Sequence, residues 1–133
     1  MIGVDTNILV RLLTRDDPVQ HAAAVRFMTA RSPQDPAYVC REVLIELVWV
    51  LGQTYRYRRD EIAEALRGLL IAPDIVFEAD ADVKAALVAY RETAKLDFAD
   101  AMIAAAARRA GASELVTFDK RAAALPGVRL LPA

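Results

Sequence analysis

Apolar residues recur along the chain with helical spacing, and short apolar runs separate the helical stretches. Ile8, Leu9, Leu12 and Leu13, for example, recur at intervals of three and four and so share one face of a helix. Such spacing predicts helices over residues 6–16, 16–32, 41–55, 59–72, 80–95, 97–111 and 120–125. The short apolar runs predict strands over residues 1–5, 37–40, 75–78, 114–119 and 128–131.

This order of elements predicts an α/β fold. Strands that alternate with helices form a mainly parallel sheet, here of about five strands, with helices covering both faces. At 133 residues the chain is expected to fold as a single domain, residues 1–133. Gly111 is expected to end the helix before it, because glycine readily adopts the left-handed conformation found just after a helix. Such sheets bind ligands at the carboxyl ends of their strands, so functional residues are expected there.

Composition excludes several classes of protein and several kinds of functional site. With 56% hydrophobic residues the chain is globular, yet no apolar run reaches the roughly 18 residues of a membrane helix. We therefore expect a cytoplasmic protein with no membrane partner. Cys40 is the only cysteine and His21 the only histidine. These counts exclude a disulfide within the chain, a cysteine–histidine metal cluster and most mechanisms in which histidine activates a nucleophile.

Glu46 stands out within a strongly hydrophobic helix. From residue 43 to residue 51, eight of nine residues are apolar, and Glu46 is the ninth. Burying an unpaired carboxylate costs several kcal/mol, so a partner is expected. One account is an ion pair with Arg11 or Arg41. The other is a metal ion that Glu46 shares with further acids.

Four aspartates are candidates for those further acids. Asp5 closes the first predicted strand, Asp119 follows the fourth, and Asp97 and Asp100 begin the sixth helix. All four therefore map to the carboxyl-end edge of the sheet or to helix starts that face it. Asp5, Asp97 and Asp119 could instead cap helices, with Asp100 in a first turn, and a cap typically contributes about 1 kcal/mol. Carboxylates without histidine or thiolate suit Mg²⁺ or Mn²⁺, which commonly serve phosphoryl chemistry.

Other polar residues have more modest expectations. Asp80 and Asp82 are expected to be ordinary caps of the helix that follows them. Asn7 and Thr117 lie two residues from Asp5 and Asp119 and could hydrogen-bond the metal ligands or a bound water. Turn or strand polarity explains these two residues equally well.

Four motifs stand out along the chain: "VDTNILV", "VLIELVWVL" with Glu46, "DFADAMIAAAA" with Asp100, and "LVTFDKR" with Asp119. Together they resemble those of the PIN-domain ribonucleases, and in particular of the VapC toxins of bacterial toxin–antitoxin pairs. The similarity runs in order from residue 2 to about residue 121. A single "DTN" would be weak, but four motifs at these spacings are a specific signal.

The resemblance implies a three-layer α/β/α sandwich and Mg²⁺- or Mn²⁺-dependent endonucleolytic cleavage of RNA. Asp5, Glu46, Asp100 and Asp119 match the family's metal-binding, catalytic acids, and Asp97 matches an additional metal-site acid of many members. The polar residues that border the site in the family are matched by Asn7 and Thr117. The resemblance also implies a homodimer and a cognate antitoxin that occupies the active-site groove.

One basic segment is a candidate RNA contact. In "TYRYRRDE", Arg56, Arg58 and Arg59 are interleaved with Tyr55 and Tyr57. Arginine can pair with phosphates and tyrosine can stack on bases, but a solvated connection between helices explains the same residues.

Two other functions fit parts of the pattern. In a non-catalytic protein–protein interaction module, the acids would only cap helices and pair with arginines. A phosphatase with Asp5 as nucleophile is weaker, because Asn7 stands where the second aspartate of such a site would be expected.

Overall fold

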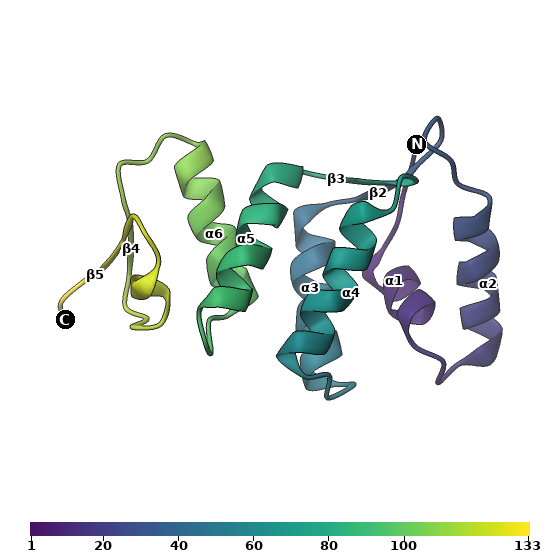
Figure 1. The fold of residues 1–133 in the computed structure, drawn as a ribbon, viewed down its shortest axis with the longest axis horizontal. Helices are drawn as coiled ribbons and strands as arrows, with labels where there is room; N and C mark the ends of the chain where they lie inside the picture. Colours follow the sequence, from purple (N-terminus) through teal and green to yellow (C-terminus); the bar gives the residue numbers. More distant parts are fainter. The chain divides into compact units, whose positions relative to one another are not determined.

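The computed structural model describes residues 1–133 (Figure 1). It comprises two compact units, Met1–Glu78 and Ala79–Ala133, which are described separately. A single domain over the whole chain therefore stays a prediction.

The first unit contains a three-stranded parallel sheet. Its strands are β1 (Ile2–Gly3), β2 (Ala37–Val39) and β3 (Ile75–Phe77), in the spatial order β1-β2-β3. The short strands lie at the positions that the apolar runs predicted. Ala37 and Val39 of the central strand are almost fully buried, as expected for a strand with neighbours on both sides.

Four helices complete this unit: α1 (Thr6–Leu13), α2 (Pro18–Thr29), α3 (Arg41–Gln53) and α4 (Arg59–Ile71). Helix α2 starts where its sequence predicts. The Asp17 side chain accepts the Gln20 N–H at 2.9 Å, and Pro18 occupies the first turn, where a missing N–H costs nothing.

The second unit pairs two helices and two strands. Its elements are α5 (Asp80–Glu92), α6 (Phe98–Arg109), β4 (Leu115–Thr117), the 3₁₀ turn η1 (Ala122–Ala124) and β5 (Val128–Leu130). Strands β4 and β5 are parallel, with Leu115 opposite Val128. The core between α5 and α6 includes the buried rings of Tyr90 and Phe98. The two rings lie edge to face, with their centroids 5.8 Å apart.

The end of α6 confirms the role predicted for Gly111. Its φ angle is +84°, and its N–H donates to the Arg108 carbonyl at 3.0 Å. The Ala112 N–H donates to the Ala107 carbonyl, also at 3.0 Å, which completes a Schellman motif.

Two expectations for this unit are wrong. Asp80 and Asp82 are not caps, because the helix starts one residue earlier than a cap at Asp80 would allow and Ala79 takes the N-cap position. Asp80 instead pairs with Lys84 at 2.7 Å, and the buried Asp82 pairs with Arg109 at 2.8 Å. The helix expected over residues 120–125 is only the three-residue 3₁₀ turn η1.

The α/β fold class is confirmed. All five expected strands are present, both sheets are parallel, and six α-helices alternate with the strands as predicted. The strands form one sheet of three and one sheet of two. None of the helices combines the length and apolar character needed to cross a lipid bilayer.

Candidate active site

In the first unit, Asp5 lies at the start of α1. It follows the buried Val4 at the carboxyl end of β1 and is the N-cap residue of the helix. Its Oδ1 accepts the Thr6 N–H at 2.7 Å, while Oδ2 has no hydrogen-bond partner. The cap and an exposed carboxylate oxygen therefore coexist at Asp5.

Glu46 lies on the exposed side of α3, so the expectation that it is buried is wrong. The buried face of α3 consists of Leu44, Leu47, Val48 and Leu51, and at about 100° per residue Glu46 falls on the opposite face. The prediction of burial was wrong because apolar residues of α3 continue onto its exposed face.

The structural alternative for Glu46 also fails. No ion pair joins Glu46 to Arg11 or Arg41. Arg11 instead forms an ion pair with Asp16, with Nη1 and Oδ1 3.0 Å apart. The Glu46 carboxylate is therefore exposed and without a basic partner.

The second unit brings Asp97, Asp100 and Asp119 into electrostatic contact. Partial burial raises the pKa of Asp100, and the charges of Asp97 and Asp119 raise it further. No lysine or arginine of the unit forms an ion pair with any of the three. Three neighbouring carboxylates without a counter-ion repel one another, and a bound cation would relieve this repulsion.

Two of these aspartates also accept backbone N–H groups, Asp97 as the N-cap of α6 and Asp119 within the turn before η1. The Asp97 Oδ1 accepts the Ala99 N–H at 3.1 Å at the start of α6. The Asp119 Oδ1 accepts the N–H groups of Arg121 at 2.7 Å and Ala122 at 3.1 Å. In each carboxylate the bonds involve one oxygen and leave Oδ2 free. Capping and cation binding are thus compatible roles for the same side chain.

The polar residues beside the acids are placed differently. The Thr117 Oγ1 accepts the Asp119 N–H at 3.0 Å, so this hydroxyl helps to fix the turn that carries Asp119. Asn7 is exposed in the first turn of α1 and borders an open cavity of about 410 Å³ lined also by Ile8 and Phe27.

The tyrosines of the basic segment have structural contacts. The Tyr55 hydroxyl donates to Asp16 at 2.8 Å, and the Tyr57 hydroxyl donates to the Leu13 carbonyl at 3.4 Å. Arg58 pairs with Asp60 at 3.1 Å. These bonds hold the connection between α3 and α4 against α1 and the residues after it, which supports the structural explanation of this segment. An RNA contact by the segment's arginines remains a prediction.

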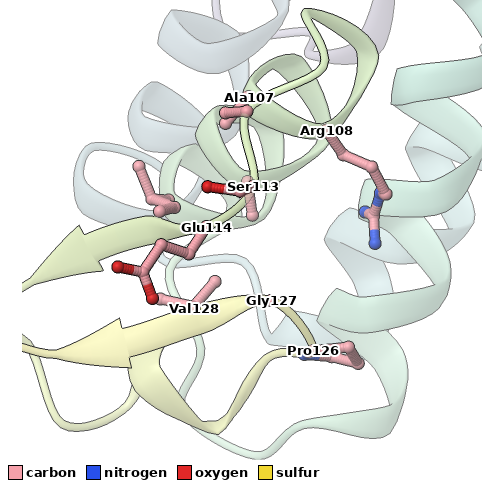
Figure 2. A pocket seen from close by; sticks show the side chains of 10 residues that line it. Ala107, Arg108, Ser113, Glu114, Pro126, Gly127 and Val128 are labelled. Atoms are coloured by element: carbon pink, nitrogen blue, oxygen red, sulfur yellow. The ribbon is translucent and has the colours of Figure 1, made fainter.

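A cavity in the second unit lies apart from the acids. It has a volume of about 280 Å³ and is bordered by Arg108 near the end of α6, by Ser113 and by Gly127 (Figure 2). Glu114 on its rim is held by Arg129 at 2.7 Å. None of the candidate acids lines this cavity, so it is not part of the candidate site.

The donor set fits a hard divalent cation in its chemistry. Every candidate ligand is a carboxylate, the type of group that Mg²⁺ and Mn²⁺ prefer. Neither unit by itself brings three His, Cys, Asp or Glu side chains together closely enough to hold a metal ion.

Comparison with known proteins places the chain in a family. Residues 2–128 match the model of the PIN domain, a range that includes all five candidate acids. The chain belongs to the PIN-domain family. A VapC ribonuclease of Aquifex aeolicus (strain VF5) is 25% identical over 118 residues, which cover 89% of this chain and 87% of that protein. The resemblance to PIN domains, inferred from four motifs, is therefore confirmed.

Proposed function

We propose that this PIN-domain protein is a Mg²⁺- or Mn²⁺-dependent endoribonuclease and the toxin of a toxin–antitoxin pair. The observation that carries the proposal is that residues 2–128, which include all five candidate acids, match the PIN domain. The raised pKa of Asp100, caused by partial burial and by the charges of Asp97 and Asp119, is consistent with it. Similarity to a VapC ribonuclease supports RNA as the substrate.

Each acid has a role in this proposal. Asp5, Glu46, Asp100 and Asp119 hold the cation and are the catalytic acids, and Asp97 adds a further carboxylate. When bound, the cation supplies positive charge that lowers the pKa of a water molecule and offsets the charge of the phosphodiester. The backbone N–H bonds to Asp5, Asp97 and Asp119 fix these carboxylates before the cation arrives, which reduces the reorganisation that binding requires.

Partners and location follow from the same proposal. A toxin of this kind acts on RNA in the cytoplasm, is restrained by a cognate antitoxin and forms a homodimer. The rival proposal of a non-catalytic interaction module draws support from the caps at Asp5 and Asp97 and from the turn bonds of Asp119. It does not explain why these carboxylates lack basic partners.

Cleavage of a labelled RNA tests the activity. We expect cleavage with Mg²⁺ or Mn²⁺, none with EDTA, and a loss of at least about a hundredfold in Asp5→Asn and in Asp100→Asn, as is typical when a catalytic electrostatic group is removed. Asp60→Asn and Asp80→Asn are matched controls, because these exposed aspartates pair only with nearby Arg58 and Lys84. Full cleavage by both Asp5→Asn and Asp100→Asn would refute the assignment, provided that all variants remain folded.

A further inference from the structure

The turn after β4 holds its backbone rigidly on both sides of Asp119. Thr117 accepts the Asp119 N–H at 3.0 Å, and the Asp119 carboxylate accepts the N–H groups of Arg121 at 2.7 Å and of Ala122 at 3.1 Å. These three bonds fix the direction in which the neighbouring side chains leave the turn. Phe118, Lys120 and Arg121 are therefore presented from a preorganised segment.

Phe118 is exposed although it is large and apolar. Its exposed fraction is 68%, whereas the other rings of this unit, Tyr90 and Phe98, are 5% and 1% exposed. An exposed ring forgoes the stabilisation that burial would bring, and a single such residue needs no explanation by itself. What distinguishes Phe118 is its place: Asp119, a proposed metal-site acid, follows it directly, and the cations Lys120 and Arg121 come next.

Lys120 and Arg121 are exposed, and neither side chain forms an ion pair. Three other cations of the unit are paired with a carboxylate: Lys84 with Asp80, Arg109 with Asp82 and Arg129 with Glu114. Unpaired cations beside an acidic group can receive an anion without first breaking an internal contact. Next to an exposed ring, this combination suits a strand that offers both phosphates and unstacked bases.

We propose that the turn Phe118–Arg121 is a single-stranded RNA contact, which rests on the proposed ribonuclease function. A base stacks on Phe118, and Lys120 and Arg121 contact the phosphates on either side of it. Because Phe118 adjoins Asp119 in the chain, this contact positions the strand relative to the acid without taking part in the chemistry. Phe118 is thus a positioning residue for the substrate.

Fluorescence anisotropy with a labelled 12-nucleotide single-stranded RNA in EDTA tests the proposal without cleavage. Phe118→Leu keeps an apolar side chain but removes the π face, and Phe118→Trp keeps the π face. Removing a stacked base contact is expected to raise Kd about 5- to 150-fold in Phe118→Leu, while Phe118→Trp binds at least as tightly as the wild type. In Lys120→Ala/Arg121→Ala, the slope of log Kd against log salt should fall by about 1.4 if each cation contacts one phosphate.

Several outcomes would overturn the contact. They are no binding by the wild type, equal binding by Phe118→Leu, or equal affinity for a duplex of the same length. Far-UV circular dichroism confirms that the variants are folded. Failure of the proposed function would appear elsewhere, as a wild-type protein that binds RNA but does not cleave it with Mg²⁺ or Mn²⁺.

Discussion

The ion pair between Asp82 and Arg109 should stabilise the two helices that carry most of the second unit. Asp82 lies in the first turn of α5 and Arg109 in the last turn of α6, and the Asp82 Oδ2 and Arg109 Nε lie 2.8 Å apart. A double-mutant cycle with Asp82→Asn and Arg109→Gln isolates their interaction. The cycle is needed because Asp82 has a further interaction, so the single substitution would overstate the pair.

The expected coupling energy follows from the exposure of the two side chains. Exposed ion pairs contribute about 0.2–1 kcal/mol, and hydrogen bonds to charged groups about 1.5–3 kcal/mol. The side chain of Asp82 is 7% exposed and that of Arg109 is 55% exposed, so solvent screens only one partner. We therefore expect a coupling of about 1–2 kcal/mol, between the two ranges. With an unfolding entropy of about 2.1 cal/mol/K per residue over 133 residues, this corresponds to about 4–7 °C in Tm.

Urea unfolding of the wild type, both single variants and the double variant measures this coupling. Asp80→Asn with Lys84→Gln is a matched cycle, because that i,i+4 pair lies on the surface of the same helix and should couple by about 0.3–0.5 kcal/mol. A coupling for Asp82 and Arg109 no larger than that of the surface pair would refute the reasoning.

Two further predictions concern the backbone and the charge of the site. Gly68→Ala should stabilise the protein by up to about 1 kcal/mol, since a Cβ at this interior position of α4 meets nothing within 4 Å. Gly111→Ala should destabilise the protein by about 1–2 kcal/mol, because its φ of +84° is strained for alanine. Equal shifts of the urea midpoint in the two variants would contradict this. Because the pKa of Asp100 is raised from its usual 3.8, the folded protein holds this proton to higher pH than the unfolded chain. In EDTA the contribution of Asp100 to stability should therefore fall as pH rises above 3.8 and level off above the folded-state pKa. Over this interval Asp100→Asn should gain stability relative to the wild type. A stability difference between the two proteins that does not change with pH would contradict the electrostatic account.

Local signals in the sequence predicted the elements well. The period of apolar residues identified α3, and Gly111 marked the end of α6 because only a residue tolerant of positive φ suits that position. The same signals could not tell which face of α3 is buried, since apolar residues such as Trp49, 63% exposed, occupy both faces. Glu46 was therefore predicted to be buried although it is exposed.

Contacts between distant residues escaped prediction for a different reason. Asp82 and Arg109 are 27 positions apart, and nothing in their local patterns links them. At the site, sequence reasoning opposed capping to cation binding as alternatives. The structure shows that Asp5 and Asp97 use one carboxylate oxygen for the cap and leave the other free, a distinction between two atoms that no residue pattern contains.

The central claim is that the candidate acids hold a divalent cation. Calorimetric titration of Mn²⁺ into the wild type, Asp5→Asn, Asp100→Asn and the control Asp80→Asn tests it most directly. The account predicts a site in the wild type and in the control that is lost in Asp5→Asn and in Asp100→Asn alike. Mn²⁺ binding of unchanged affinity in either Asp5→Asn or Asp100→Asn would contradict it.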